Sequence, residues 1–285
     1  MSNSADRMRG TSALDGVVAE TAAGRLLPGV HRCLLRVETP RRPQGWTAAA
    51  TTHHNDGGGL DTDVAFRIAS VTKMMTATAL LALADQGRCQ LEDPTGRHLP
   101  GDLLDRFRDS EGRAYGAGIT LRQLLDHTSG LPNFFSQPPI LEAVRHGGGR
   151  RRFTPLDLVD LAAAGEPPTS PPGTVRSYTD TGFLLAGLII QALTGRPLQQ
   201  AYRELVLDPA GMTDTWLESS DEAPRRRAIA PHDFAGRDIT DMDPTVDWAG
   251  GGLVSTAADL AAFLRALTRG QLVSEGAWRE QVASA

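Results

Sequence analysis

Hydrophobic and polar residues follow two different patterns along the chain. Near its start, residues 31–37 (HRCLLRV) and 45–51 (GWTAAAT) are short runs separated by prolines and arginines, which predicts two strands joined by a turn. From Ser70 onward the apolar residues recur at steps of three and four, which is typical of a helix. These residues are Met74, Ala77, Leu80, Leu81 and Ala84. We expect this helix to end at Gly87.

Helix-start signals predict further helices downstream. The expected starts and their supporting residues are Thr120 with Gln123, Thr154 with Pro155, Thr181, and Thr256 with Asp259. Gly195 is positioned to close the third of these helices, and Gly270 follows the last, which we expect to run through Leu267. The longest apolar stretch, residues 183–193, is too short to span a bilayer, so it predicts a buried helix and no membrane segment.

The order of these elements predicts one domain over residues 1–285. Strands come first, helices fill the middle, and a glycine-rich approach at 249–256 returns late to the first region. We therefore expect an α/β part formed by residues 14–84 plus 246–285, with a helical subdomain, residues 85–245, inserted into it. No internal repeat is apparent in the chain.

Composition narrows the class of protein. Apolar residues make up 40% and charged residues 22% of the 285 positions, as in ordinary globular proteins. The formal net charge of −5 gives no reason to expect a nucleic-acid partner. The N-terminus shows no basic lead followed by an apolar run, so we see no signal peptide and expect a cytoplasmic protein. A wrongly assigned start would leave export open, and the sequence does not indicate an oligomeric state.

Nothing in the sequence calls for a metal or an organic cofactor. Adjacent His53 and His54 do not easily converge on one ion, and the glycines at 57–59 mark a turn, so we interpret this stretch as a hairpin connection. Cys33 and Cys89 lack the spacing of a metal site, and we expect two buried free thiols.

One lysine stands alone among the cations. The chain has 29 lysine and arginine residues, and only Lys73 is a lysine. Arginine stays protonated, whereas a buried lysine can lose its proton and act as a general base. Lys73 follows Ser70 by about one helical turn, so both side chains fall on one face, and the helix start favours a developing alkoxide at Ser70. The alternative is a surface lysine left by chance.

Residues 66–73 (FRIASVTK) resemble the nucleophile motif of class C β-lactamases, DD-peptidases and their esterase relatives. Three more segments are similar to motifs of that family in order and spacing: 124–132 (LLDHTSGLP), 178–187 (YTDTGFLLAG) and 251–260 (GGLVSTAADL). The resemblance covers the chain from about Val30 onward. It implies an α+β fold of the β-lactamase/transpeptidase type, with an antiparallel sheet flanked by helices and an inserted helical subdomain.

The resemblance also implies a reaction. Ser70 would attack a carbonyl group, Lys73 would abstract or relay its proton, and Tyr178 would shuttle a proton to the leaving group. The expected partner is a small-molecule or peptide substrate: an ester, a small amide or peptide, or a β-lactam. The alternative for Tyr178 is a buried aromatic residue with a satisfied hydroxyl. By the same resemblance, His127 and Ser129 belong to a structural turn.

Two departures from the family pattern qualify this expectation. No lysine or histidine follows Gly252, so the third motif, a Lys or His on a sheet-edge strand, is absent. We therefore expect C-terminal sheet strands to be missing, the domain to be incomplete at that end, and the chain to be a weak catalyst. A family member that binds a ligand or partner through the same cleft without turnover is the rival hypothesis.

The second departure is Asp180, which stands where many members have asparagine. We expect it close to Lys73 and Tyr178, as a substrate-binding residue that holds Lys73 protonated. An anionic Asp180 would disfavour carboxylate-bearing substrates, which favours neutral esters or small amides over β-lactams. The alternative is that Asp180 points away and only caps the helix expected to begin near Thr181.

Overall fold

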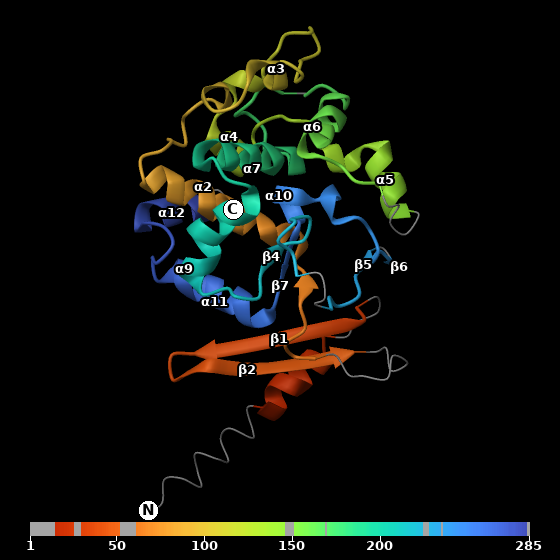
Figure 1. The fold of residues 1–285 in the computed structure, drawn as a ribbon, viewed down its shortest axis with the longest axis vertical. Helices are drawn as coiled ribbons and strands as arrows, with labels where there is room; N and C mark the ends of the chain where they lie inside the picture. Colours follow the sequence, from red (N-terminus) through yellow and green to blue (C-terminus); the bar gives the residue numbers. More distant parts are fainter. Residues whose placement is uncertain are drawn as a thin grey trace, which may run out of the picture.

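The computed structural model describes residues 15–25, 30–51, 61–145, 151–168, 170–224, 228–234 and 236–283. The hairpin connection predicted at His53 and His54 lies outside these residues. The described chain forms a mixed α+β structure, with a long β-hairpin at one end and a helical body above it (Figure 1).

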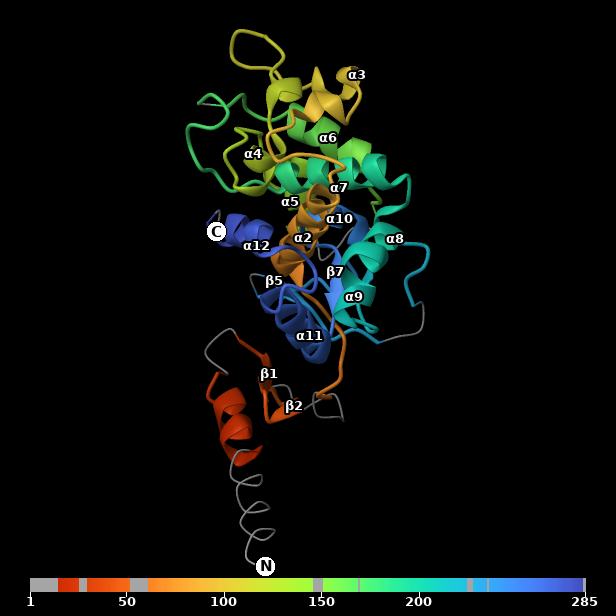
Figure 2. The same ribbon diagram turned by 90° about the vertical axis from the view of Figure 1, so that its left-hand side faces the viewer.

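The two strands expected near the start are confirmed. β1 (Arg32–Thr39) and β2 (Arg42–Thr51) pair antiparallel, from Arg32 opposite Thr51 to Thr39 opposite Arg42. A helix over residues 15–23 covers one face of the hairpin, and Figure 2 shows both at the end of the molecule remote from α3 (Gly101–Leu104).

The centre of the body is built from α2 (Thr72–Asp85), α7 (Asp180–Thr194) and the short α10 (Trp248–Gly251), which all contact one another. Gly87 and Gly195 adopt left-handed conformations after α2 and α7, as the sequence predicted. A small antiparallel sheet adjoins this centre in the order β3-β7-β4. Its strands are β3 (Phe66–Arg67), β4 (Trp216–Leu217) and β7 (Leu253–Ser255).

The start predicted for α7 is wrong by one residue. Thr179, in extended conformation, is the residue before the helix, and its side chain accepts a hydrogen bond from the Thr181 backbone N–H. The other predicted starts are confirmed. Thr120 and Thr154 form capping boxes, the second with Pro155 at the first helical position, and Thr256 accepts from the Asp259 N–H.

The remaining elements surround this centre. Above it lie α3, α4 (Leu121–Leu125), α5 (Pro138–Arg145) and α6 (Pro155–Ala163) (Figure 1). The other helices and strands are α8 (Leu198–Tyr202), α9 (Asp208–Ala210), α11 (Ala257–Thr268), α12 (Glu275–Ala283), β5 (Asp233–Phe234) and β6 (Arg237–Asp238). A π-helical turn, Arg203–Leu207, joins α8 to α9.

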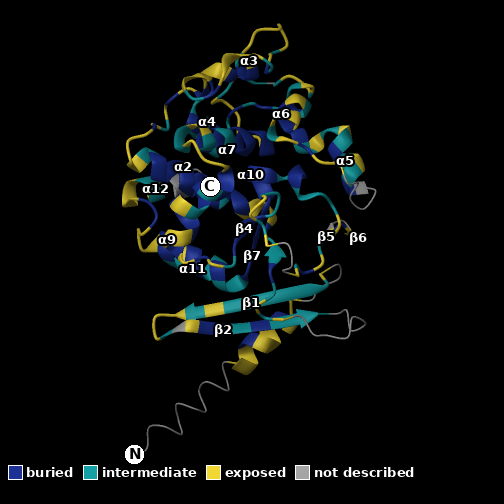
Figure 3. Cartoon of the chain, in the orientation of Figure 1, coloured by how far each residue is buried: buried dark blue, intermediate teal, exposed yellow. Residues whose placement is uncertain are grey.

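One large hydrophobic core fills the body, and Figure 3 shows α2, α7 and α10 largely buried within it. Cys89 is buried there as expected, but Cys33 on β1 is only partly buried, which corrects that prediction. Among the described residues no single helix is long and apolar enough to cross a membrane. Only α7 taken together with Leu198–Ala210 would have that length and composition, and these two segments meet at an angle of 81°.

Candidate active site

Ser70 stands at a sharp change of backbone direction between β3 and α2. The Ile68 N–H donates to the Leu253 carbonyl of β7 at 3.0 Å, and Ala69 then adopts a φ of +44°, which is rare for a residue with a Cβ atom. A short 3₁₀ turn, Ala69–Val71, leads into α2. Ser70 is exposed. The β-sheet therefore anchors the strained turn that presents the Ser70 hydroxyl near the N-terminus of a buried helix.

Lys73 is buried one turn further along α2, and its Nζ donates three hydrogen bonds. The acceptors are Ser70 Oγ at 3.1 Å, Asp180 Oδ1 at 2.5 Å and the Gly250 carbonyl at 2.9 Å. An ammonium group has three protons and no lone pair, so this arrangement matches the charged form of the side chain.

The electrostatics agree with this geometry. Burial is the largest influence on the pKa of Lys73 and lowers it, but the Asp180 carboxylate and then Tyr178 raise it. The balance leaves the pKa of Lys73 above its ordinary value. Lys73 is thus held as an ammonium ion at neutral pH.

Tyr178 lies beside both residues. Its hydroxyl is 2.7 Å from Ser70 Oγ, and Lys73 Nζ is 4.9 Å from the centre of its ring. The alternative of a buried tyrosine is wrong, because Tyr178 is 54% exposed. An exposed phenol bonded to an exposed serine is positioned to pass a proton to or from a bound substrate.

Asp180 faces into the site, so the alternative in which it only caps α7 is also wrong. Thr179 provides the cap, and this leaves the Asp180 carboxylate free to contact Lys73. Asn133 holds it from the other side: Asn133 Nδ2 donates to Asp180 Oδ2 at 3.3 Å, and the Asp180 N–H donates to Asn133 Oδ1 at 3.2 Å. Asn133 was not predicted from the sequence, although it directly follows the 124–132 motif.

His127 and Ser129 shape the loop that carries Tyr178. His127 has a φ of +63°, its Nδ1 accepts from the Thr179 N–H at 3.3 Å, and its ring centre lies 4.5 Å from that of Tyr178. Burial first, and then the charge of Lys73, lower the pKa of His127. Ser129 is fully buried, and its Oγ accepts from the Leu131 N–H. These contacts support the structural turn expected for this segment.

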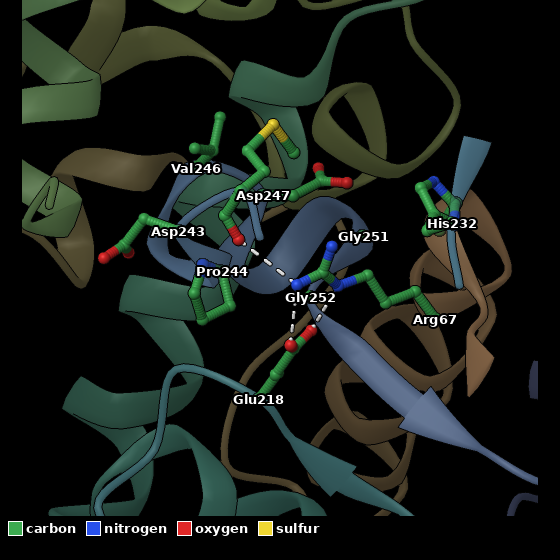
Figure 4. Close-up of a pocket in the computed structure, with 11 residues that line it drawn as sticks. Arg67, Glu218, His232, Asp243, Pro244, Val246, Asp247, Gly251 and Gly252 are labelled. Carbon is green, nitrogen blue, oxygen red and sulfur yellow. Dashed lines mark hydrogen bonds and ion pairs between the residues drawn. The ribbon is translucent and has the colours of Figure 1, made fainter. Parts of the chain in front are cut away.

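A pocket lies beside this site, and Ala69, the residue before Ser70, is part of its lining. Figure 4 shows Arg67, Glu218 and Asp247 around it. Arg67 crosses it and forms a bidentate ion pair with Glu218. Arg67 Nε donates to Glu218 Oε2 at 2.7 Å, and Nη2 donates to Oε1 at 2.8 Å. The same guanidinium donates to the carbonyls of Ile239 and Met242. Arg67 thereby ties the segment that leads to α10 onto β3, directly under the turn of Ser70.

Asp247 also lines this pocket, and it was not predicted from the sequence. Burial is the main cause that raises the pKa of its carboxyl group to about 6; nearby Asp180 adds to the rise and Lys73 opposes it. Gly250 and Gly251 follow directly, and a Cβ on Gly251 would collide with the Asp247 carboxyl group. The segment from Asp247 to Gly251 therefore depends on glycine to bring charged side chains together.

Comparison with known proteins agrees with this geometry. The β-lactamase family profile matches residues 18–284. The chain belongs to the β-lactamase family. Penicillin-binding protein 4 of Amycolatopsis lactamdurans is 32% identical over 226 residues, which are 76% of this chain and 54% of that protein. The family resemblance inferred from the motifs is thereby confirmed.

Two solved structures also share the fold. A D-stereospecific amidohydrolase from Streptomyces sp. superposes with a TM-score of 0.75 at 31% identity, covering 94% of this chain and 76% of that one. A D-amino acid amidase from Ochrobactrum anthropi SV3, complexed with D-phenylalanine, gives a TM-score of 0.74 at 26% identity, covering 93% and 74%. The α+β, β-lactamase/transpeptidase-like fold is confirmed. The chain spans about half the length of the curated relatives it matches.

Proposed function

We propose that this β-lactamase-family chain is a serine hydrolase that cleaves neutral esters or small amides through an acyl-Ser70 intermediate. The observation that carries the proposal is the hydrogen-bonded array in which Ser70 Oγ lies 2.7 Å from the Tyr178 hydroxyl and 3.1 Å from Lys73 Nζ. A nucleophile within hydrogen-bond reach of two proton-transfer groups is the arrangement that covalent acyl transfer requires.

The chemical steps follow from these contacts. Ser70 Oγ forms a bond to the substrate carbonyl carbon, and its proton passes to the phenolate oxygen of Tyr178, which becomes the phenol, or, where the amine is neutral, to Lys73. The Ser70 backbone N–H, in the first turn before α2, donates to the developing oxyanion. Collapse of the tetrahedral intermediate expels the alcohol or amine, which takes a proton from Tyr178, and water then releases the acid.

Charge supports the choice of substrate. Asp180 and Asp247 place two carboxyl groups at the site, whereas penicillins carry a carboxylate of their own, which like charge disfavours. The D-stereospecific amidohydrolase, at 31% identity, is an amide-cleaving relative by its name. Both observations favour neutral esters or small amides.

A second candidate is a family member that binds a ligand or partner through this cleft without turnover. It is favoured by the buried ion pair with Asp180, which holds Lys73 as an ammonium ion without a lone pair to accept the Ser70 proton. Lys73, the only lysine in a chain that otherwise uses arginine, favours the enzyme.

Covalent labelling tests the proposal. Incubation with a fluorophosphonate, followed by peptide mass mapping, should give one adduct, on Ser70. Ser70→Ala should abolish it, and Ser110→Ala, at an exposed serine in a turn after α3, should not. Lys73→Arg keeps the charge but cannot accept a proton, so nitrophenyl ester hydrolysis at alkaline pH, where Lys73 can act as a base, should fall by roughly 10²–10⁴-fold. Near-full turnover by Lys73→Arg at alkaline pH, or labelling that survives Ser70→Ala, would contradict the proposal. An adduct without turnover would instead support the binding-only candidate.

A further inference from the structure

Asp247 lies immediately before α10 and reaches under the proposed site. We propose that Asp247 is a positioning residue of that site, a second carboxyl group that acts with Asp180 to hold Lys73 as an ammonium ion. Its kinetic consequence rests on the proposed function, but the electrostatic effect does not.

Gly250 shows how closely the three charged side chains approach. A Cβ placed on Gly250 would lie 3.3 Å from Asp180 Oδ1 and 3.5 Å from Lys73 Nζ. The same point is 3.6 Å from Asp247 Oδ1. The distance between Asp247 Oδ1 and Lys73 Nζ cannot exceed the sum of their distances to this Cβ position. The two atoms therefore lie within about 7 Å of each other. Charges at that separation in a partly dry site interact appreciably.

The Asp247 carboxyl group is also available for this interaction. The residue lines the pocket of Figure 4, and no side-chain hydrogen bond is found for its carboxyl group within the described part of the chain. Its backbone carbonyl, by contrast, accepts from the N–H groups of Gly250 and Gly251 at 3.0 and 2.7 Å. The backbone is therefore fixed, while the charge has no donor of its own to neutralise it.

The other charged and titratable groups around the site are paired, hydrogen-bonded or neutral. Arg67 is paired with Glu218, and Asp243 Oδ1 accepts from the Thr245 N–H and hydroxyl. Burial lowers the pKa values of His232, in the same pocket, and of His127, above Tyr178, and keeps both neutral near pH 7. The groups that face Lys73 and Asp247 from all the packed elements are Ser70, Tyr178, Asp180, His127, Arg67, Glu218, His232 and Asp243.

The coupling between Lys73 and Asp247 acts in both directions. The ammonium charge of Lys73 lowers the pKa of Asp247, against the burial and the Asp180 charge that raise it to about 6. Coupling free energies between two sites are reciprocal, so ionised Asp247 must raise the pKa of Lys73 by the same amount. Above pH 6 two carboxylates thus stabilise one ammonium ion, and below it one remains.

This arrangement affects how Ser70 loses its proton. Because Lys73 is protonated at neutral pH, the proton of Ser70 can pass only to Tyr178 in its phenolate form, and Lys73 becomes a base only at alkaline pH. Removing the Asp247 charge destabilises the ammonium form, lowers the pKa of Lys73 and makes the neutral amine available at lower pH. The acidic limb of the kcat/KM profile should move in the same direction.

The lone lysine makes the test direct. Protein labelled with ¹³C at the lysine ε-carbon gives one lysine resonance, from Lys73, whose pH titration needs no assignment. We would compare Asp180→Asn with Asp180→Asn/Asp247→Asn, because the first substitution brings the titration into an accessible range. In the double variant the pKa of Lys73 should lie about one unit lower than in Asp180→Asn alone. Asp180→Asn/Asp160→Asn, which removes a carboxylate paired with Arg106 at the surface, is the control and should leave it unchanged.

Wild-type protein provides a second measurement, which does not depend on the Asp180 and Asp247 variants. The Lys73 resonance should show a small additional inflection with a midpoint near pH 6, as Asp247 ionises, and it should persist in His127→Asn. Absence of this inflection, or an unchanged Lys73 titration in the Asp247→Asn pair, would overturn the proposal. If the titration moves but no acylation occurs, the role of Asp247 stands and the proposed hydrolase function fails.

Discussion

The contact between Lys73 Nζ and Asp180 Oδ1 governs the chemistry available to this site. At 2.5 Å the two groups form a buried ion pair, whereas a neutral amide at the same place would leave the lysine dependent on burial alone. Burial favours the uncharged amine, and the carboxylate favours the ammonium ion. One residue therefore decides whether Lys73 rests as a base or as an acid.

Asp180→Asn should move the acidic limb of kcat/KM to lower pH by one unit or more, which is the size typical of a lost carboxylate at this range. Asp180 raises the pKa of Lys73, so its removal lowers that pKa and increases the fraction of neutral amine at a given pH. Acylation by penicillin should also improve, because a repelling charge is lost. Ester hydrolysis measured from pH 6 to 10 and penicillin labelling provide the readouts.

Asp160→Asn is the control for that experiment, since Asp160 is a carboxylate paired with Arg106 at the protein surface. Its profile should match that of the wild type. An unchanged pH profile in Asp180→Asn would show that the ion pair has no influence on the reacting groups.

Some residues of the site could be predicted from the sequence and others could not. Ser70, Lys73, Tyr178 and Asp180 belong to recognisable motifs, and the structure brings all four together. Asp247 carries no motif of its own, and it approaches Lys73 only because α10 packs against α2. Contacts made by packing between distant segments leave no local pattern to read.

At the level of elements, the site depends on the close approach of α7 and α10. Gly187 of α7 lies where a Cβ would be 2.6 Å from Ala249 Cβ and 2.8 Å from the Trp248 ring. The Ala249 carbonyl accepts from Thr76 Oγ at 2.8 Å, and the next carbonyl, of Gly250, accepts from Lys73. Packing of α7 on α10 thus fixes the carbonyl that orients the lysine.

Gly187→Ala should destabilise the protein by about 1–3 kcal/mol, the usual cost of overpacking a well-packed contact. It should also slow acylation of Ser70, because α10 must shift and carry the Gly250 carbonyl with it. Denaturant unfolding and fluorophosphonate labelling rates measure the two effects. Gly101→Ala, at the start of α3 with open space around its Cβ position, should change neither. Wild-type stability in Gly187→Ala would mean that the two helices are not held at this distance.

Helix starts illustrate what local sequence can predict about elements. Threonine caps at 120 and 256 were predicted from the polar residue three positions later, and the cap at 154 from Pro155 at the first helical position. At α7 the sequence Tyr-Thr-Asp-Thr offers two threonines, and the extended backbone of Thr179 selects the first. That selection places Asp180 in the first turn, facing Lys73, and it depends on tertiary contacts of the loop.

At the scale of the whole molecule, the described residues form one large hydrophobic cluster and two much smaller ones. The large core lies among the helices of the body, whereas Val18, Ala22, Trp46 and Ala48 form a small cluster between the helix over 15–23 and the hairpin. The hairpin is joined to the body by contacts of β1 with α11 and by ion pairs, Glu38 with Arg265 and Arg32 with Asp233. The assignment of residues 14–84, 246–285 and 85–245 to subdomains stays a prediction.

This division predicts that the hairpin opens more readily than the body. Stability against local opening grows with the apolar area that an element buries, and the small cluster buries far less than the core around α2 and α7. The ion pairs between the two parts are partly exposed to solvent and add little, about 1 kcal/mol or less each. In native-state hydrogen exchange, amides of β1 and β2 should therefore exchange through openings of lower free energy than those of α7.

Trp46→Ala provides the sharper form of this prediction, because Trp46 is the largest side chain of the small cluster. It should lower protection across residues 32–51 while leaving the protection of α2 and α7, and the labelling of Ser70, close to the wild type. The reason is that Cys33 and Leu35 pack with Trp46 on the face towards the 15–23 helix, whereas Arg32 and Leu34 line a pocket against Phe66 of the body. Parallel loss of protection in α2 and α7 would show instead that hairpin and body unfold as one cooperative unit, and that the proposed site depends on both.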